Sequence, residues 1–147
     1  MNLTILRDGA DGNNVGLAWM PTNIEAINVT RSTSRTAYYE PVQNRSNLQL
    51  LVNHYVLSIE FDKTQAVGAT VVSRATGEKT IVRAKKEVIL AAGAVNTART
   101  LQLSGIGPSD LLTSLGINVI VDAPGVGSNF QDHPFIVLTY NCESYYL

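Results

Sequence analysis

The residues best placed for ligand chemistry lie where an apolar run meets a helical pattern. Gly93 and Ala94 directly follow the apolar run over 88–92, and an amphipathic pattern typical of a helix then covers 94–104. Small residues at such a junction let a ligand approach the backbone, and the free N–H groups of a helix start attract a phosphate or another anion. The junction therefore suits an anion contact, but such junctions are common, and from these residues alone we favour plain packing. Both interpretations stay open.

A polar loop over 123–134 carries the second group of candidate residues. His133 suits a general base because histidine titrates near neutrality. A histidine next to Asp132 is also readily a loop residue that hydrogen-bonds its neighbour, and we favour this second interpretation. The run Gly125-Val126-Gly127 is not a dinucleotide fingerprint, because Phe130 stands where the third glycine would fall and no helical pattern follows.

Strands that precede the junction must position it. Segments rich in β-branched or aromatic residues predict strands over 48–53, 55–61, 67–74 and 79–84. The last two should form a hairpin, because residues 75–78 have the sequence of a turn. The uninterrupted apolar run over 88–92 is typical of a strand that is buried on both faces of a sheet.

Helices and further strands flank this region. A short helix is expected over 33–43, started by a hydroxyl cap and stopped near Pro41. The helix over 94–104 should end at Gly105, and a second helix should run from Pro108 or Ser109 to Gly116. Strands are predicted over 117–121 and 135–140, whereas residues 1–33 have the composition of loop.

Composition excludes several classes of protein. The chain has 147 residues, 45% of them hydrophobic and 16% charged, and a net charge of −1. This balance leaves no basic face for nucleic acid and too much apolar content for a disordered chain. The apolar runs are far shorter than the roughly 20 residues of a membrane span. Cys142 has no cysteine partner, no zinc spacing is present, and no secretory signal pattern opens the sequence, so no metal and no compartment are assigned.

Several motifs together resemble the glucose-methanol-choline (GMC) family of flavoprotein oxidoreductases, and the aryl-alcohol oxidase-like fungal members in particular. The stretch over 93–108, GAVNTARTLQLSGIGP, is similar to the second signature of the family, with Ala98 in place of Pro or Ser and Thr100 in place of an aliphatic residue. The likeness continues in RSTSRTAY (31–38), NL (47–48), KEVILAAGA (86–94) and GVGSNFQDHP (125–134). It covers nearly the whole chain, roughly residues 12–134.

The resemblance implies a mixed α/β chain that forms part of a Rossmann-like FAD-binding domain with a segment of the substrate domain. Members of the family bind FAD and oxidise an alcohol by hydride transfer to the flavin. The implied divisions are a loop-rich substrate-side segment over 1–33, the middle of the FAD-binding domain over 34–134, and the start of the substrate-domain sheet over 135–147. The chain is therefore expected to be an internal fragment or a truncated member.

The resemblance also implies cofactor contacts. Val56 is similar to the position whose backbone meets the adenine, and a core strand residue is the alternative interpretation. Gly93 and Ala94 are similar to the junction along the dinucleotide. The implied FAD-binding residues are Val56, Gly93, Ala94, Asn129, Asp132 and His133.

No catalytic residue is assigned. The family places a Gly-x-Gly-x-x-Gly turn near its N-terminus and a catalytic histidine near its C-terminus, and neither is found in these 147 residues. We therefore expect the isolated chain neither to hold FAD tightly nor to oxidise alcohols, and to expose apolar surface through which it self-associates. A non-catalytic, truncated paralogue that binds a protein partner is the alternative function, and a small α/β module with a chance match is a third. The alcohol and the electron acceptor are not assigned.

Overall fold

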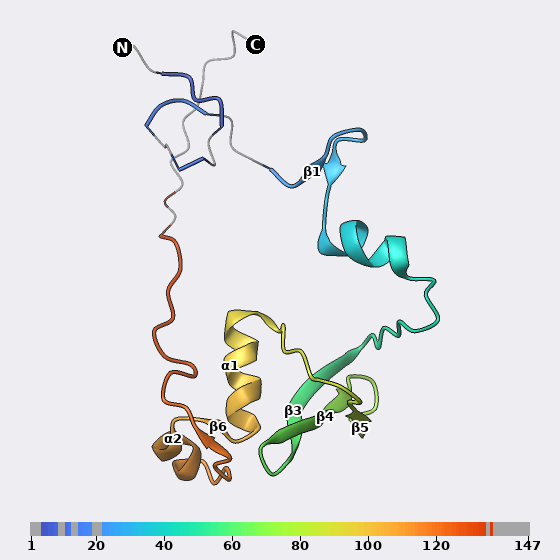
Figure 1. Cartoon of the computed structure of the whole chain (residues 1–147), viewed down its shortest axis with the longest axis vertical. Helices are drawn as coiled ribbons and strands as arrows, with labels where there is room; N and C mark the ends of the chain where they lie inside the picture. Colours follow the sequence, from blue (N-terminus) through green and yellow to red (C-terminus); the bar gives the residue numbers. More distant parts are fainter. Residues whose placement is uncertain (1–3, 9–10, 13–14, 19–21, 135, 137–147) are drawn as a thin grey trace. The chain divides into compact units, whose positions relative to one another are not determined.

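The computed structural model describes residues 4–8, 11–12, 15–18, 22–134 and 136. The chain forms two compact units, Met1–Leu50 and Leu51–Leu147 (Figure 1). The candidate site lies entirely in the second unit.

Among its described residues, the first unit holds two short strands, β1 (Ile24–Glu25) and β2 (Thr30–Arg31), and two short helical turns, η1 (Arg35–Tyr39) and η2 (Glu40–Val42). Strands β1 and β2 pair antiparallel, and a single bridge joins Ile5 to Leu17. The Thr33 hydroxyl accepts a hydrogen bond from the Thr36 amide at 3.3 Å, whereas Ser34, at the cap position, makes no side-chain capping hydrogen bond. The helical region is confirmed, but it consists of a π-helical turn and a 3₁₀ turn.

A three-stranded antiparallel sheet forms the first half of the second unit. Strands β3 (His54–Asp62), β4 (Gln65–Ser73) and β5 (Lys79–Arg83) follow one another in the sheet. The Ser73 amide donates to the Glu78 carbonyl at 3.0 Å, and Gly77 adopts a φ of +72° in the turn between β4 and β5. These observations confirm the strands predicted over 55–61, 67–74 and 79–84 and the hairpin between the last two.

The second half of this unit is a small β-α-β arrangement that follows the longer helix. Helix α1 spans Gly93–Leu103, and Gly105 follows it with a φ of +87°, as the expected left-handed cap requires. Strand β6 (Ile106–Gly107), helix α2 (Ser109–Ser114) and strand β7 (Val121–Asp122) come next, and β6 pairs parallel to β7. The short helix α2 is the crossover that a parallel pair needs.

One buried serine joins α1 to the sheet. The Ser104 hydroxyl accepts a hydrogen bond from the Ile59 amide of β3 at 2.7 Å and donates to the Thr100 carbonyl at 2.6 Å. Ser104 and Thr100 are both buried, as are the β-sheet residues Ile59, Val71 and Val72. Because a buried polar group needs a partner, this pair of hydrogen bonds fixes the end of α1 against β3.

The strand predicted over 48–53 is absent. The Leu48 amide instead donates to the Arg45 carbonyl at 3.1 Å in a turn, and Asn53 adopts a φ of +57°. The Asn53 carbonyl accepts a hydrogen bond from the Arg74 amide at 2.8 Å, but residues 48–52 pair with none of the described strands. Its β-branched and apolar residues therefore do not produce a strand.

The strand predicted over 88–92 is also absent from the structure, and Ile89 is 78% exposed. A strand that is apolar on both faces needs neighbouring strands and covering layers, which the described residues do not supply. Of the strand predicted over 117–121, only Val121 is in a strand, because β7 comprises the two residues that pair with the two residues of β6. The strand predicted over 135–140 lies outside the described residues, except for Ile136.

Candidate functional site

Three open grooves surround helix α1: one lies between α1 and the loop after β7, one between α1 and the start of β3, and one at the start of α1. We name them the loop groove, the strand groove and the junction groove. Their volumes are about 580, 430 and 470 Å³, within the size range of small-molecule sites. All three lie in the second unit.

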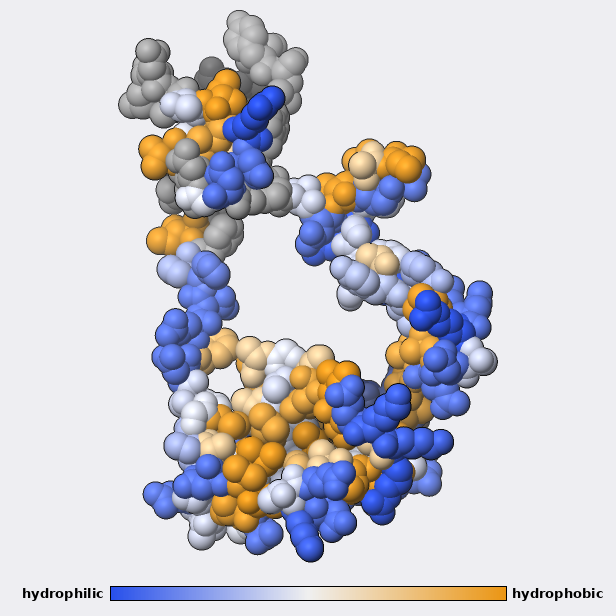
Figure 2. Space-filling model, in the orientation of Figure 1, coloured by the Kyte–Doolittle hydropathy of each residue, from blue (hydrophilic) through white to orange (hydrophobic). Residues whose placement is uncertain are grey.

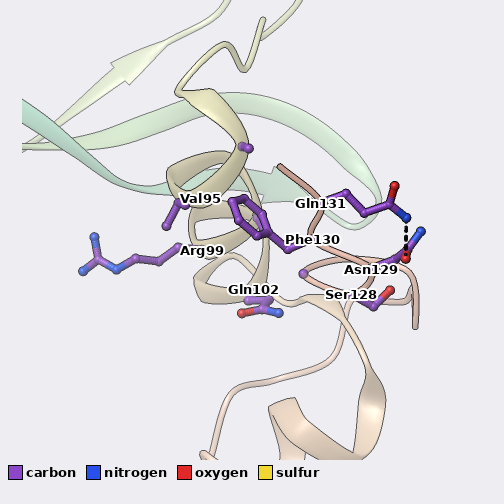
Figure 3. Close-up of a pocket in the computed structure, with 10 residues that line it drawn as sticks. Val95, Arg99, Gln102, Ser128, Asn129, Phe130 and Gln131 are labelled. Atoms are coloured by element: carbon purple, nitrogen blue, oxygen red, sulfur yellow. Dashed lines mark hydrogen bonds between the residues drawn. The ribbon is translucent and has the colours of Figure 1, made fainter. Parts of the chain in front are cut away.

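The loop groove lies between one face of α1 and the polar loop that follows β7. Figure 3 shows Val95, Arg99 and Gln102 projecting from the helix and Phe130 and Gln131 projecting from the loop. Val95 and Phe130 are 65% and 67% exposed, so this groove presents apolar surface without being closed. Its lining residues are Ala94, Val95, Ala98, Arg99, Gln102, Gly127, Ser128, Asn129, Phe130 and Gln131.

The strand groove lies between α1 and the start of β3, and it is basic. Arg74 and Arg99 both line it, and no ion pair holds either guanidinium within the part of the chain that the structure describes. The Arg74 guanidinium carbon lies 5.6 Å from the centre of the Tyr55 ring, a cation–π distance. Val56 lines the groove beside Tyr55.

The junction groove lies at the start of α1 and is lined mainly by small residues. Gly93 adopts a φ of +79°, which favours glycine, and a Cβ placed on it would meet nothing within 4 Å. The open space at Gly93 therefore leaves its backbone accessible. The other lining residues are Ala91, Ala94, Thr97, Ala98, Leu101, Val126 and Gly127.

The first turn of α1 leaves its backbone donors available to a ligand. Ala92 occupies the cap position, no side chain caps the turn, and no acidic residue lies within it. The Ala92 amide donates to the Thr97 hydroxyl at 3.2 Å, so this hydroxyl orders the residue that precedes the helix. A helix start of this kind favours an anion through its free N–H groups.

Most of the sequence-predicted site residues line these grooves. Val56 lines the strand groove, Gly93 the junction groove, and Asn129 the loop groove, whereas Ala94 lines both the loop and junction grooves. Asn129 adopts a φ of +53°, and its Oδ1 accepts a hydrogen bond from Gln131 Nε2 at 3.0 Å. Direct contact of these residues with a cofactor stays a prediction.

Asp132 and His133 do not line any of the three grooves. Both residues are exposed, and the Asp132 carboxylate accepts a hydrogen bond from the His133 backbone amide at 2.7 Å. This contact agrees with the interpretation of His133 as a loop residue that is bonded to its neighbour. Their part in cofactor binding also stays a prediction.

Sequence reasoning missed the groove residues Arg99 and Gln102 on α1 and Phe130 on the loop. The helical spacing of Val95, Arg99 and Gln102 places them on one face and was a usable signal. The sequence did not indicate which segment packs on that face, because residues 123–131 lie about two dozen positions further along the chain. The pairing of β7 with β6 brings them back to α1.

Two classes of site are not seen among the residues that the structure describes. No group of three or more His, Cys, Asp or Glu side chains there could hold a metal ion. No helix in that part of the chain has the length and apolar character to cross a bilayer.

Comparison with known proteins gives the family. Residues 2–135 match the family described as GMC oxidoreductase. A GMC oxidoreductase family protein of Malassezia sympodialis is 44% identical over 137 residues, which cover 90% of this chain and 22% of that protein. An oxygen-dependent choline dehydrogenase of Pseudomonas putida is 40% identical over 115 residues, covering 78% of this chain and 20% of that protein.

Solved structures agree with this assignment. An FAD-dependent oxidoreductase from Chaetomium thermophilum has a TM-score of 0.84 and 44% identity, and it covers 88% of this chain and 22% of its own length. A fungal aryl-alcohol oxidase has a TM-score of 0.82 and 35% identity with the same coverage. The chain thus spans about a fifth of the length of the relatives it matches. It is a mixed helix-and-strand segment of a Rossmann-like, FAD-binding architecture, and it belongs to the GMC oxidoreductase family.

Proposed function

We propose that this chain is a segment of an FAD-dependent oxidoreductase that acts on the CH–OH group of alcohol donors. Its part is to supply cofactor-side walls around α1, and no residue of the chain is assigned to proton transfer. The observation that carries the proposal is the junction groove, where Gly93 exposes backbone beside the uncapped first turn of a helix in a chain of this family.

The residues present fit FAD. A side chain at position 93 would enter the open space of the junction groove, which glycine leaves free for a ligand. The unbonded amides of the first turn of α1 suit a phosphate, and the Arg74 and Arg99 guanidiniums add positive charge in the strand groove. Gly93, Ala94 and Val56 are the residues that we expect along the dinucleotide, and Asn129, Asp132 and His133 the residues near the flavin side.

The role of the chain's own residues is to bind and orient the FAD cofactor. When FAD is bound, its flavin supplies the hydride acceptor. The backbone at Gly93 and the methyl group of Ala94 set how closely the dinucleotide approaches α1. The Phe130 and Val95 side chains offer apolar surface in the loop groove, which excludes water from any ring packed there.

The activity itself is tested by flavin reduction. The flavoprotein that contains this segment should be yellow, and an alcohol should bleach its flavin absorbance without oxygen. Choline and a benzylic alcohol are suitable first substrates, because a choline dehydrogenase and an aryl-alcohol oxidase are among the similar proteins. A flavin that stays oxidised with both and with a wider alcohol panel would refute the proposed reaction.

A matched pair of glycine variants tests the placement of the cofactor. Gly93→Val is expected to lower FAD affinity about tenfold, because the new side chain enters the space where the dinucleotide approaches. Gly77→Val is the control, since Gly77 has a similar φ of +72°, also meets nothing within 4 Å, and lies in the β4–β5 turn. Both variants should lose stability through backbone strain, but Gly77→Val should keep full affinity. Equal flavin titration curves for the two variants would contradict the placement.

A protein-binding role is the second candidate, and exposed apolar side chains favour it. Ile89, Val95 and Phe130 are 78%, 65% and 67% exposed, and Figure 2 shows apolar residues at the surface of the unit that carries α1. Such surface also suits a segment that packs against other parts of a longer protein. Light scattering tests whether this surface drives self-association: concentration-dependent dimers of the 147-residue chain would support it, and a monomer at every concentration would contradict it.

A further inference from the structure

Gln102 joins the last turn of α1 to the polar loop. Its Nε2 donates a hydrogen bond to the Val126 carbonyl at 3.1 Å, and the contact is partly buried. No other hydrogen bond joins α1 to residues 123–131, all of which the structure describes. The Gln102 side chain is thus the one hydrogen-bonding group through which the helix itself holds the loop, whereas the Ala123 amide at the start of the loop donates to the Gly107 carbonyl of β6 at 2.9 Å.

Two glycines make room for the Gln102 side chain. A Cβ on Gly127 would lie 2.6 Å from Gln102 Nε2, and a Cβ on Gly107 would lie 3.1 Å from Gln102 Cγ. Gly127 also adopts a φ of +82°, so its backbone conformation favours glycine as well. The Gln102 side chain is thus held in a slot between β6 and the loop, which fixes the direction of its amide.

The position of the loop determines the second wall of the loop groove. Residues 127–131 follow directly after Val126 and line the loop groove together with Val95 and Arg99 of α1, and Figure 3 shows the Phe130 ring next to the helix. Beyond Ala123, the loop's own hydrogen bonds are local: the Val126 amide donates to the Ala123 carbonyl at 3.0 Å, and the Ser128 amide to the Gly125 carbonyl at 3.3 Å. These local bonds shape the turn but do not attach it to α1.

We propose that Gln102 is a positioning residue, which holds the polar loop against α1 so that residues 127–131 form a wall of the flavin-side groove. Its role in flavin affinity rests on the proposed function, whereas its role in placing the loop does not. An experiment can therefore refute the effect on flavin affinity without refuting the role of Gln102 in placing the loop.

Two variants of similar side-chain length distinguish the effect of the hydrogen bond from the effect of filling space. Gln102→Met keeps the length of the side chain and removes the donor. Gln102→Glu also removes the donor at neutral pH and puts a carboxylate next to the Val126 carbonyl. Below about pH 4 a glutamate becomes protonated, and its O–H can donate to that carbonyl again.

Amide hydrogen exchange of the 147-residue chain, followed by NMR, measures the loop directly. Loss of one hydrogen bond should speed exchange at the Val126 and Ser128 amides about five- to tenfold in both variants at pH 7. The Val71 amide in β4 serves as the internal control and should not change. At pH 3.5 the rate relative to wild type should return to near one in Gln102→Glu and stay raised in Gln102→Met.

Two outcomes of the exchange measurement would overturn the proposal. Unchanged loop exchange in Gln102→Met, or a ratio in Gln102→Glu that does not respond to pH, would show that Gln102 fills space without positioning the loop. In the flavoprotein, Gln102→Met should also weaken FAD binding about fivefold. Faster loop exchange with unchanged flavin affinity would leave the loop placement standing and refute the assignment of this groove to the flavin.

Discussion

Replacing Ala94 with phenylalanine is expected to lower the FAD affinity of the flavoprotein about 100-fold, equivalent to about 2.8 kcal/mol of binding free energy. Ala94 lines both the loop groove and the junction groove, so a large ring there would occupy both. The position itself is exposed, and helix α1 tolerates a large side chain on an exposed face. The loss should therefore come from blocked contact with the cofactor and not from unfolding. Flavin fluorescence during reconstitution of the apoprotein measures it.

Ala75→Phe is the matched control for this change. Ala75 is also exposed, it lies in the turn between β4 and β5, and it does not itself line any of the three grooves. This variant should bind FAD as the wild type does. If Ala94→Phe kept wild-type affinity and a normal melting temperature, the grooves around α1 would not be cofactor walls.

Replacing Leu112 with alanine is expected to lower the free energy of unfolding of the second unit by about 2–5 kcal/mol. Leu112 has 0% exposure, and its side chain packs close to the Gly107 backbone. Removal of the isobutyl group would lose transfer free energy and leave a cavity beneath β6. Urea denaturation monitored by circular dichroism measures the change.

The neighbouring leucine provides the control for burial. Leu111 lies on the same helix, is 42% exposed, and should lose less than about 1 kcal/mol on the same substitution. Equal losses at both positions would mean that Leu112 does not form the core of the β6–α2–β7 arrangement.

The sequence predicted local structure well wherever neighbouring residues supply the partners. The β4–β5 hairpin, the extent of α1 and the left-handed Gly105 all depend on contacts within a few positions. The segment over 88–92 shows the opposite case. Its apolar pattern is typical of a buried strand, but a strand needs neighbours, and the described residues do not supply them.

The candidate site was predictable only in part for a similar reason. Gly93 and Ala94 were visible because small residues at a strand-to-helix junction have a local physical meaning. The role of Gln102 could not be predicted, because it depends on Val126 and Gly127, which the β6–β7 pairing brings back to α1. A single sequence does not reveal such contacts between distant segments.

The central claim is that the grooves around α1 face the flavin cofactor. Titration of the ¹⁵N-labelled 147-residue chain with FAD, followed through its amide resonances, tests this claim most directly. We expect weak, saturable binding with a Kd on the order of millimolar, because the chain supplies walls of the site and lacks the glycine-rich pyrophosphate turn. The shifts should centre on Val56, on residues 92–95 and on residues 127–131. Shifts confined to the β5 edge, or none at α1 while the chain stays folded, would contradict the claim.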